Sequence, residues 1–196
     1  MWITLVENFH ISPVKLSELE AIEKRVMGES GINSYTLQPF AHYAKIFTIE
    51  LTPGRPERCE GGGEILETES LTQNGGAVPP GDNTGIIVSP AFDIDGRRKV
   101  YGAAEFIRSF SDLGHAHLFG FYVDEVLRSS GAASWFLNRC ENSLKRGHSI
   151  CSIDLSVAED NLRAVAFYRK NGYSVLESVK DYYGSGRDRL IMNKKI

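Results

Sequence analysis

The stretch Arg128-Ser129-Ser130-Gly131-Ala132-Ala133 decides the fold, and it follows an apolar run at 116–123. An apolar strand that leads through a glycine turn into a helix presents unpaired backbone N–H groups at the positive end of the helix dipole. Gly131 has no side chain to hold an anion away from these amides, and Arg128 adds a positive charge. The same residues also fit a plain helix N-terminus with a serine cap.

A second stretch reads Asn161-x-x-Ala164-x-x-x-Tyr168-x-x-x-Gly172-Tyr173. Asn161, Ala164 and Tyr168 recur at i, i+3 and i+7, so they share one face of a predicted helix. This face offers an amide, a small patch and a phenol. Taken alone, such a tyrosine is more often a core aromatic whose hydroxyl lies at the rim of the core.

Together the two stretches resemble the acyl-CoA-binding core of the GNAT superfamily of N-acyltransferases. The first matches the family's Q/R-x-x-G-x-G/A loop, between its fourth strand and third helix, at Arg128, Gly131 and Ala133. The second matches N-x-x-A-x-x-x-Y-x-x-x-G-F/Y. The chain departs from the family by carrying serines at both variable positions between Arg128 and Gly131. The resemblance covers about residues 85–194 well and 1–50 loosely.

The resemblance implies an α/β (α+β) fold, in which a central curved mixed sheet is flanked by helices. The sheet is expected to be antiparallel in its first part and parallel where the fourth and fifth strands meet. It also implies acetyl-CoA as co-substrate, with no metal, and Tyr168 as the general acid that protonates the departing thiolate. The residues that it places on acetyl-CoA are Phe121, Tyr122, Val123, Arg128, Ser129, Ser130, Gly131, Ala132, Ala133 and Asn161.

The attack of an amine on a thioester also requires a base. His115 and His117 lie two apart in a predicted strand and therefore point to the same face. His117 stands where serotonin N-acetyltransferase-like enzymes carry a histidine, and we predict that it is the base. A strand histidine satisfied by backbone and a His-x-His metal pair are the alternatives. Asp154 and Glu105 are the reserve bases.

Ser156 stands where bacterial ribosomal-protein N-acetyltransferases carry a glutamate, and a serine cannot replace it. Near the C-terminus, the segment 181–192 reads as strand, glycine turn, strand. Its Tyr182 and Tyr183 are similar to a pair that lines the peptide groove of protein N-terminal acetyltransferases, or they are exposed hairpin aromatics. We place both tyrosines and Glu105 on the acceptor side of the site.

Composition limits the class of protein. The 196 residues are 42% hydrophobic and 24% charged, which predicts one globular domain over 1–196. The net charge of −3 argues against nucleic-acid binding. The three cysteines have no zinc-like spacing, and neither a signal peptide nor an apolar run of about 20 residues is apparent. We therefore expect a cytoplasmic protein that makes no membrane contact, either monomer or homodimer.

Hydrophobic periodicity predicts a first strand at 3–9, a helix over 16–26 with a capping box at Ser17 and Glu20, and a second helix at 35–46. The segment 52–85 is rich in glycine and proline and is expected to be a flexible insertion, a loop or a lid, with a short strand at 64–66. The remaining elements expected are strands at 85–88, 100–107, 115–123, 150–157, 173–181 and 188–194, and helices from 133 to Arg146-Gly147 and over 160–171. Cys140 and Cys151 are expected to be buried.

Two functions fit these observations. The first is an acetyl-CoA-dependent N-acetyltransferase that acts on a primary amine, either a small metabolite or a peptide N-terminus. The second is a catalytically degenerate domain that binds acyl-CoA as a sensor or interaction module. Retention of Tyr168 and His117 favours the enzyme, whereas Ser156 and the 52–85 insertion leave the module open.

Overall fold

The computed structural model describes residues 2–8, 11–28, 33–52, 63–70 and 99–196. These residues form eight strands, hydrogen-bonded as one mixed sheet in the order β3-β1-β2-β4-β5-β6-β8-β7. The chain divides into two compact units, one of residues 1–105 and 120–140, the other of 106–119 and 141–196. The strands β4 (Lys99–Arg108) and β5 (His115–Val123) contribute residues to both units.

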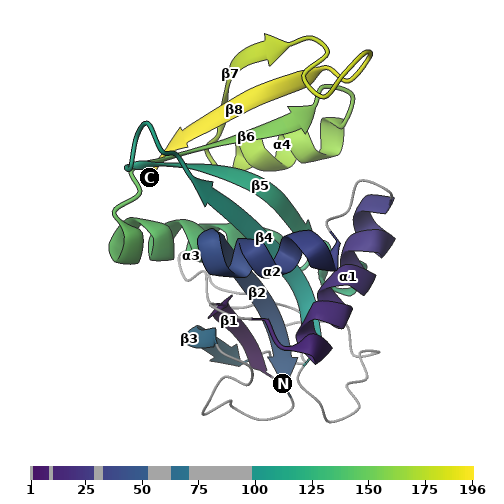
Figure 1. Cartoon of the computed structure of the whole chain (residues 1–196), viewed down its shortest axis with the longest axis vertical. Coiled ribbons are helices and arrows are strands. Elements are labelled where there is room, and N and C mark those ends of the chain that lie inside the picture. Colours follow the sequence, from purple (N-terminus) through teal and green to yellow (C-terminus); the bar gives the residue numbers. More distant parts are fainter. Residues whose placement is uncertain (1, 9–10, 29–32, 53–62, 71–98) are drawn as a thin grey trace. The chain divides into compact units, whose positions relative to one another are not determined.

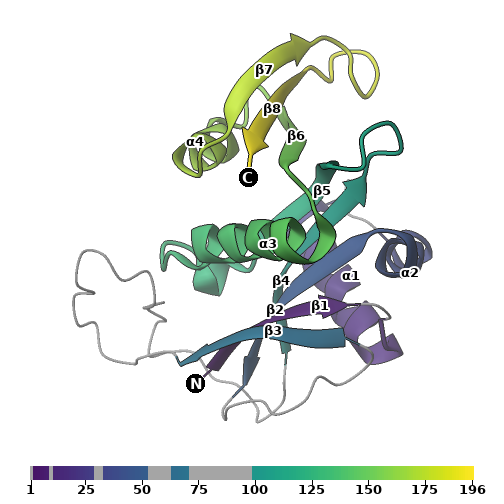
Figure 2. The ribbon, with the colours of Figure 1, turned by 90° about the vertical axis from the view of Figure 1, so that its left-hand side faces the viewer.

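The first unit contains β1 (Trp2–Asn8), β2 (Lys45–Thr52) and β3 (Gly63–Ser70), with β1 in the middle and antiparallel to both neighbours (Figure 2). The helices α1 (Pro13–Met27) and α2 (Ser34–Tyr43) lie together beside these strands (Figure 1). They bury an apolar core against residues of β2, β4 and β5. Its buried members are Ile11, Leu19, Ile22, Leu37, Ala41, Ile46, Val100, Ala103 and Tyr122.

The second unit contains β6 (Ser152–Ala158), β7 (Ser174–Val179) and β8 (Arg189–Lys195), which pairs antiparallel with both β6 and β7. The helix α4 (Leu162–Lys170) connects β6 to β7. β5 and β6 run parallel, paired from His115 with Ser152 to Leu118 with Leu155. The expected parallel contact between the fourth and fifth GNAT strands is thereby confirmed.

The helix α3 (Ala132–His148) begins in the first unit and ends in the second. It was expected to end at Arg146-Gly147, but it continues to His148, and Ser149 takes the left-handed conformation with φ of 56°. α4 does end before a glycine as predicted, because Gly172 has φ of +90°. Cys140 is buried as expected, whereas Cys151, which precedes β6, is exposed.

Several expected elements of the N-terminal half need correction. α1 begins after Ser12, whose Oγ accepts from the Lys15 N–H at 3.3 Å, so no capping box forms at Ser17. The Ser17 hydroxyl instead donates to the carbonyl of Pro13. The second helix was extended too far, since α2 ends at Tyr43 and Lys45 already begins β2. Pro39 lies inside α2, where one N–H donor is consequently missing.

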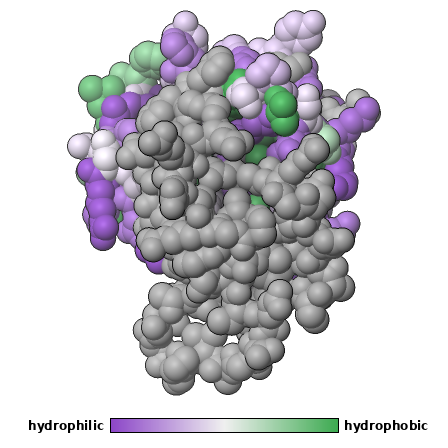
Figure 3. Space-filling view, turned by 90° about the horizontal axis from the view of Figure 1, so that it is seen from below, coloured by the Kyte–Doolittle hydropathy of each residue, from purple (hydrophilic) through white to green (hydrophobic). Residues whose placement is uncertain are grey.

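The predicted insertion at 52–85 contains the regular strand β3, longer than the expected 64–66. The rest of it, and the strand expected at 85–88, lie outside the described residues. The described side chains that are visible in Figure 3 are mainly hydrophilic, with smaller hydrophobic areas among them. No helix in the described part of the chain is long and apolar enough to cross a membrane.

Candidate active site

The glycine loop (residues 128–133) has a backbone unlike an ordinary helix start. The short 3-10 helix η2 (Glu125–Leu127) precedes it, and α3 begins at Ala132. Ser129 has φ of 63° and Gly131 has φ of 87°, so the chain enters the left-handed region twice in three residues. A Cβ on Gly131 would meet nothing within 4 Å, so glycine is favoured there by the backbone angle.

Two amides of the glycine loop are available to an anion. The Ser130 hydroxyl donates to the Leu127 carbonyl at 2.6 Å and accepts from the Ala132 N–H at 3.2 Å. The Ala132 N–H is therefore already hydrogen-bonded to the Ser130 hydroxyl. The N–H groups of Ser129 and Gly131 have no acceptor in the part of the chain that the structure describes. Alternating backbone conformations with free N–H groups beside a helix N-terminus form an anion-binding concavity.

Arg128 stands at the entrance to this loop. Its guanidinium is 3.7 Å from Glu125, and its side chain is partly exposed. The end of β5 just before the loop is fixed by Asp124, which accepts from the Val126 N–H at 3.1 Å and pairs with Arg25 of α1. The loop is thus held at a defined position with its arginine accessible.

The β5 segment Phe121–Val123, predicted to contact acetyl-CoA, continues past the last β5–β6 pair. The Phe121 ring stacks on Phe136 of α3 at 5.6 Å between centroids. Tyr122 and Val123 have buried side chains. These side chains fix the strand, and its backbone is the part that can pair with an extended ligand.

Glu105 on β4 is fully buried, and Gly120 makes room for it. A Cβ on Gly120 would stand 2.0 Å from Glu105 Oε2. Neither Glu105 oxygen nor the Tyr122 hydroxyl has a hydrogen-bond partner among the residues the structure describes. Burial and then the nearby Glu23 carboxylate raise the pKa of Glu105 well above its ordinary value, and the same causes raise that of Tyr122. Burial and the Glu23 carboxylate thus favour the protonated form of Glu105, and its role as a reserve base stays a prediction.

His115, His117, Asp154 and Ser152 form a polar cluster across the parallel strands β5 and β6. His117 Nδ1 lies 2.6 Å from Asp154 Oδ1, and His115 Nε2 lies 3.2 Å from Asp154 Oδ2. The Ser152 hydroxyl lies 2.8 Å from His115 Nδ1. Burial alone would raise the pKa of Asp154, but hydrogen bonds and charge from His117, and then from His115, hold it below its ordinary value.

Both histidines therefore project from one face of β5 as predicted, and His117 is satisfied by a carboxylate and not by backbone. Its Nε2 has no partner among the described residues, and its side chain is 27% exposed. The arrangement leaves one imidazole nitrogen open to a proton. Among the described residues, no cluster of three His, Cys, Asp or Glu side chains is placed to hold a metal ion.

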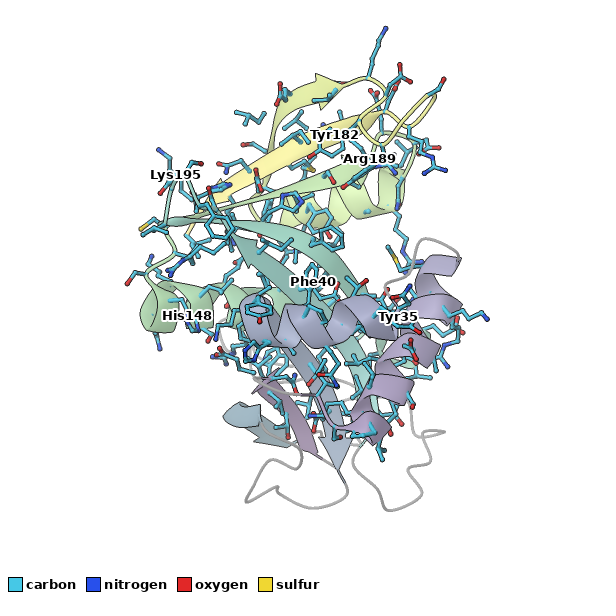
Figure 4. All side chains as sticks on the ribbon, in the orientation of Figure 1. Tyr35, Phe40, His148, Tyr182, Arg189 and Lys195 are labelled. Atoms are coloured by element: carbon cyan, nitrogen blue, oxygen red, sulfur yellow. The ribbon has the colours of Figure 1, made fainter. Side chains whose placement is uncertain are left out.

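Two tyrosines from the turn between β7 and β8 lie beside this cluster in the second unit. The Tyr183 hydroxyl is 3.0 Å from Ser156 Oγ, and Arg189 lies 5.1 Å above the Tyr183 ring. The rings of Tyr182 and Tyr183 meet edge to face at 4.7 Å. Tyr182 and Arg189 are labelled in Figure 4. Both tyrosines are partly exposed, so they offer an aromatic surface with a positive charge beside it.

The charges around Tyr182 place it near Asp154. Partial burial, followed by the negative charges of Tyr183, Asp154 and Glu177, raises the pKa of Tyr182 above its ordinary value. The two tyrosines predicted on the acceptor side thus share one surface of the second unit with the histidine–aspartate cluster.

Tyr168 of α4 is held by aromatic contacts with its neighbours. Its ring meets Tyr173 at 5.6 Å and Phe167 at 5.3 Å, both edge to face. Tyr173 is itself fixed, since its hydroxyl donates to Glu141 at 2.9 Å, and Glu141 also pairs with Lys194. Burial raises the pKa of Tyr168 far above its ordinary value, so the phenol keeps its proton at neutral pH. A protonated phenol is the form that a general acid requires.

Asn161 has a role that sequence reasoning did not assign. Its Oδ1 accepts from the Ala164 N–H at 3.1 Å, so Asn161 caps α4. The side-chain NH₂ is exposed and remains able to reach a ligand. The other residues missed were Ser152, Arg189 and the bridging role of Asp154. The period-two pattern of β6, which puts Ser152, Asp154 and Ser156 on one face, was the signal for two of them.

Comparison with known proteins shows the family to which the chain belongs. Residues 69–173 match the model of the acetyltransferase (GNAT) family. N-alpha-acetyltransferase 20 from Dictyostelium discoideum is 30% identical over 82 residues, which are 42% of this chain and 47% of that protein. The match thus spans about half the length of this relative.

Among solved structures, NAA60 from Arabidopsis thaliana, in complex with a bisubstrate analogue, superposes with a TM-score of 0.64 at 14% identity, covering 98% of this chain and 99% of that one. The ribosomal-protein-S18-alanine N-acetyltransferase from Escherichia coli gives 0.60 at 18% identity, covering 100% and 94%. These likenesses show the fold alone. The class of protein is defined by the family match over residues 69–173, which is that of the GNAT acetyltransferases. The chain belongs to the GNAT acetyltransferase family.

Proposed function

We propose that this protein transfers an acetyl group from acetyl-CoA to a primary amine, by direct attack of the amine nitrogen on the thioester. The observation that carries the proposal is the glycine loop, with its left-handed Ser129 and Gly131, its free amides and Arg128 beside them. This arrangement suits a pyrophosphate. The family match over 69–173 supports acetyl-CoA as the ligand that carries it.

The remaining residues receive roles in this reaction. The backbone of Phe121–Val123 pairs with the pantetheine arm, and the exposed amide of Asn161 contacts the same ligand. His117 Nε2 takes a proton from the attacking amine, directly or through a water molecule. As the C–N bond forms and the C–S bond breaks, Tyr168 gives its proton to the departing thiolate. The products are an amide and CoA.

For the acceptor, we propose a peptide N-terminus over a small metabolite. Tyr182 and Tyr183 are partly exposed on the surface that carries the histidine–aspartate cluster, and an extended chain can lie across such rings. The relative from Dictyostelium is named an N-alpha-acetyltransferase, which is consistent with this choice. We place the protein in the cytoplasm, where acetyl-CoA and nascent peptides meet.

The test is acceptor-dependent release of thiol from acetyl-CoA, measured against a panel of peptides with different first residues and a panel of small amines. We expect release with at least one peptide, and mass spectrometry should locate the acetyl group on its α-amine. Acetylation of small amines alone would overturn the peptide assignment. Binding of acetyl-CoA with no transfer to any amine would instead support the sensor or interaction module.

A further inference from the structure

Asp154 contacts both histidines of β5, because the parallel register sets His117 opposite Asp154 and His115 opposite Ser152. Its two oxygens are divided between the rings, Oδ1 on His117 Nδ1 and Oδ2 on His115 Nε2. Among the described residues, only the two histidines form ion pairs with these oxygens. Tyr182, Tyr183 and Glu177 lie on the β7–β8 side, and Arg189 lies over the Tyr183 ring.

We propose that Asp154 is a positioning residue that fixes the two histidines in opposite tautomers and thereby makes His117 Nε2 the proton acceptor. An ionised carboxylate has no proton to donate, so each ring nitrogen that faces it must carry a hydrogen. His117 is therefore protonated on Nδ1 and His115 on Nε2. The inference rests on the proposed function for its catalytic consequence but not for the tautomers themselves.

The contact with Ser152 agrees with this assignment. When His115 carries its hydrogen on Nε2, its Nδ1 is an acceptor, and the Ser152 hydroxyl 2.8 Å away can donate to it. At His117 the same logic leaves Nε2 with a lone pair and with no partner among the described residues. One carboxylate therefore leaves the two neighbouring histidines in different states. His117 can accept a proton on Nε2, whereas both ring nitrogens of His115 are hydrogen-bonded.

The carboxylate also supports the proton transfer itself. Its negative charge, 2.6 Å from the ring, stabilises the imidazolium that forms when His117 takes a proton. Without Asp154 the ring is no longer held in one tautomer, so the kcat/KM plateau must fall. A purely structural role for Asp154 would lower activity without changing the two tautomers.

The experiment compares Asp154→Asn with wild type by long-range ¹H–¹⁵N NMR of the histidine rings, assigned with His115→Gln and His117→Gln. In the wild type above pH 7.5, roughly one unit above the ordinary histidine range, we expect the Nδ1–H form at His117 and the Nε2–H form at His115. The side-chain NH₂ of asparagine is a donor, so the histidine nitrogen that faces it must be an acceptor without a hydrogen. One of the two histidines must therefore change its tautomer. Wild-type His117 in the Nε2–H form, or the same two tautomers in Asp154→Asn, would overturn the proposal.

The kinetic arm uses the peptide identified by the thiol-release panel. Asp154→Asn should lower the kcat/KM plateau at least tenfold, within the roughly 10⁴-fold that the equivalent change costs a serine protease. Glu159→Gln, which removes one exposed charge just after β6, is the matched control and should leave the plateau unchanged. An unchanged plateau in Asp154→Asn contradicts the proposal.

If Asp154→Asn does not fold, Asp154→Ala carries the same tautomer and kinetic tests without an amide at the site. The two arms separate the two claims. If the wild type shows the two opposite tautomers but acetylates no amine, the positioning role of Asp154 stands and the proposed function is overturned. If the wild type acetylates an amine but shows other tautomers, the proposed function stands and the positioning role is overturned.

Discussion

Tyr168 and Tyr173 are adjacent aromatic residues with different expected roles, which a matched pair of substitutions can separate. Tyr168→Phe should lower kcat on the order of 10²–10⁴-fold, because the departing thiolate loses its proton donor, while the Kd for acetyl-CoA stays unchanged. Steady-state kinetics and calorimetric titration measure the two quantities. A variant with wild-type kcat across pH 6–9 would make Tyr168 a packing residue.

Tyr173→Phe is the structural counterpart. It removes the hydroxyl that donates to Glu141 at 2.9 Å in a buried place, so the free energy of unfolding should fall by about 1.5–3 kcal/mol. Urea unfolding at pH 7 measures the loss. Equal stability of the two phenylalanine variants would show that the Glu141 contact contributes nothing.

At the residue scale, the sequence predicted which side chains are candidates for catalysis but not which hydrogen bonds they make with each other. The common face of His115 and His117 follows from strand geometry alone. Their shared carboxylate does not, because it depends on the register between β5 and β6, which are 37 residues apart in sequence. The burial of Glu105 was likewise missed, since its position against Gly120 and Glu23 arises from three separate elements.

Among the elements, the glycine loop is the one whose shape can be tested by a ligand. Gly131→Glu should abolish the rise in Tm that CoA or acetyl-CoA gives the wild type, because a carboxylate would occupy the phosphate position and repel the ligand. Differential scanning fluorimetry at millimolar ligand is sufficient. No rise in the wild type with either ligand would contradict the acyl-CoA assignment.

Gly28→Glu is the matched control for this substitution. Gly28 also has positive φ, +62°, and open space where a Cβ would stand, so both variants carry similar backbone strain. The control should lose intrinsic stability but keep the ligand-dependent rise. Loss of the rise in both variants would indicate a general fold defect and not a phosphate site.

Element prediction succeeded where one periodicity held and failed where it changed. α3, β6 and α4 carry uninterrupted patterns and were found within a few residues. The helix predicted over 35–46 took in the first two residues of β2, and no strand was predicted over the rest, although Ile46, Phe47, Ile49 and Leu51 form a β-prone run. For α1, the N-cap was predicted at Ser17 but is Ser12. Ser12 is the cap because Pro13 suits the first helical position.

For the whole molecule, the buried carboxyl of Glu105 should set part of the pH dependence of stability. Its pKa is raised in the folded state, so the protein is penalised as pH rises above the ordinary glutamate range, where the unfolded chain ionises freely. Glu105→Gln should therefore raise the free energy of unfolding, and by more at pH 8 than at pH 5. Urea titrations at both pH values measure this difference, and a variant less stable at pH 8 would contradict it.

The central claim is direct transfer of the acetyl group from acetyl-CoA to an amine, and a rapid-quench experiment tests it most directly. Enzyme is mixed with radiolabelled acetyl-CoA and the acceptor peptide for a single turnover, then denatured, and the label on protein and peptide is followed over time. The account predicts label on the peptide and none on the protein at any time, even though Cys151 is exposed. Label that appears on the protein and then passes to the peptide at the rate of turnover would contradict the account.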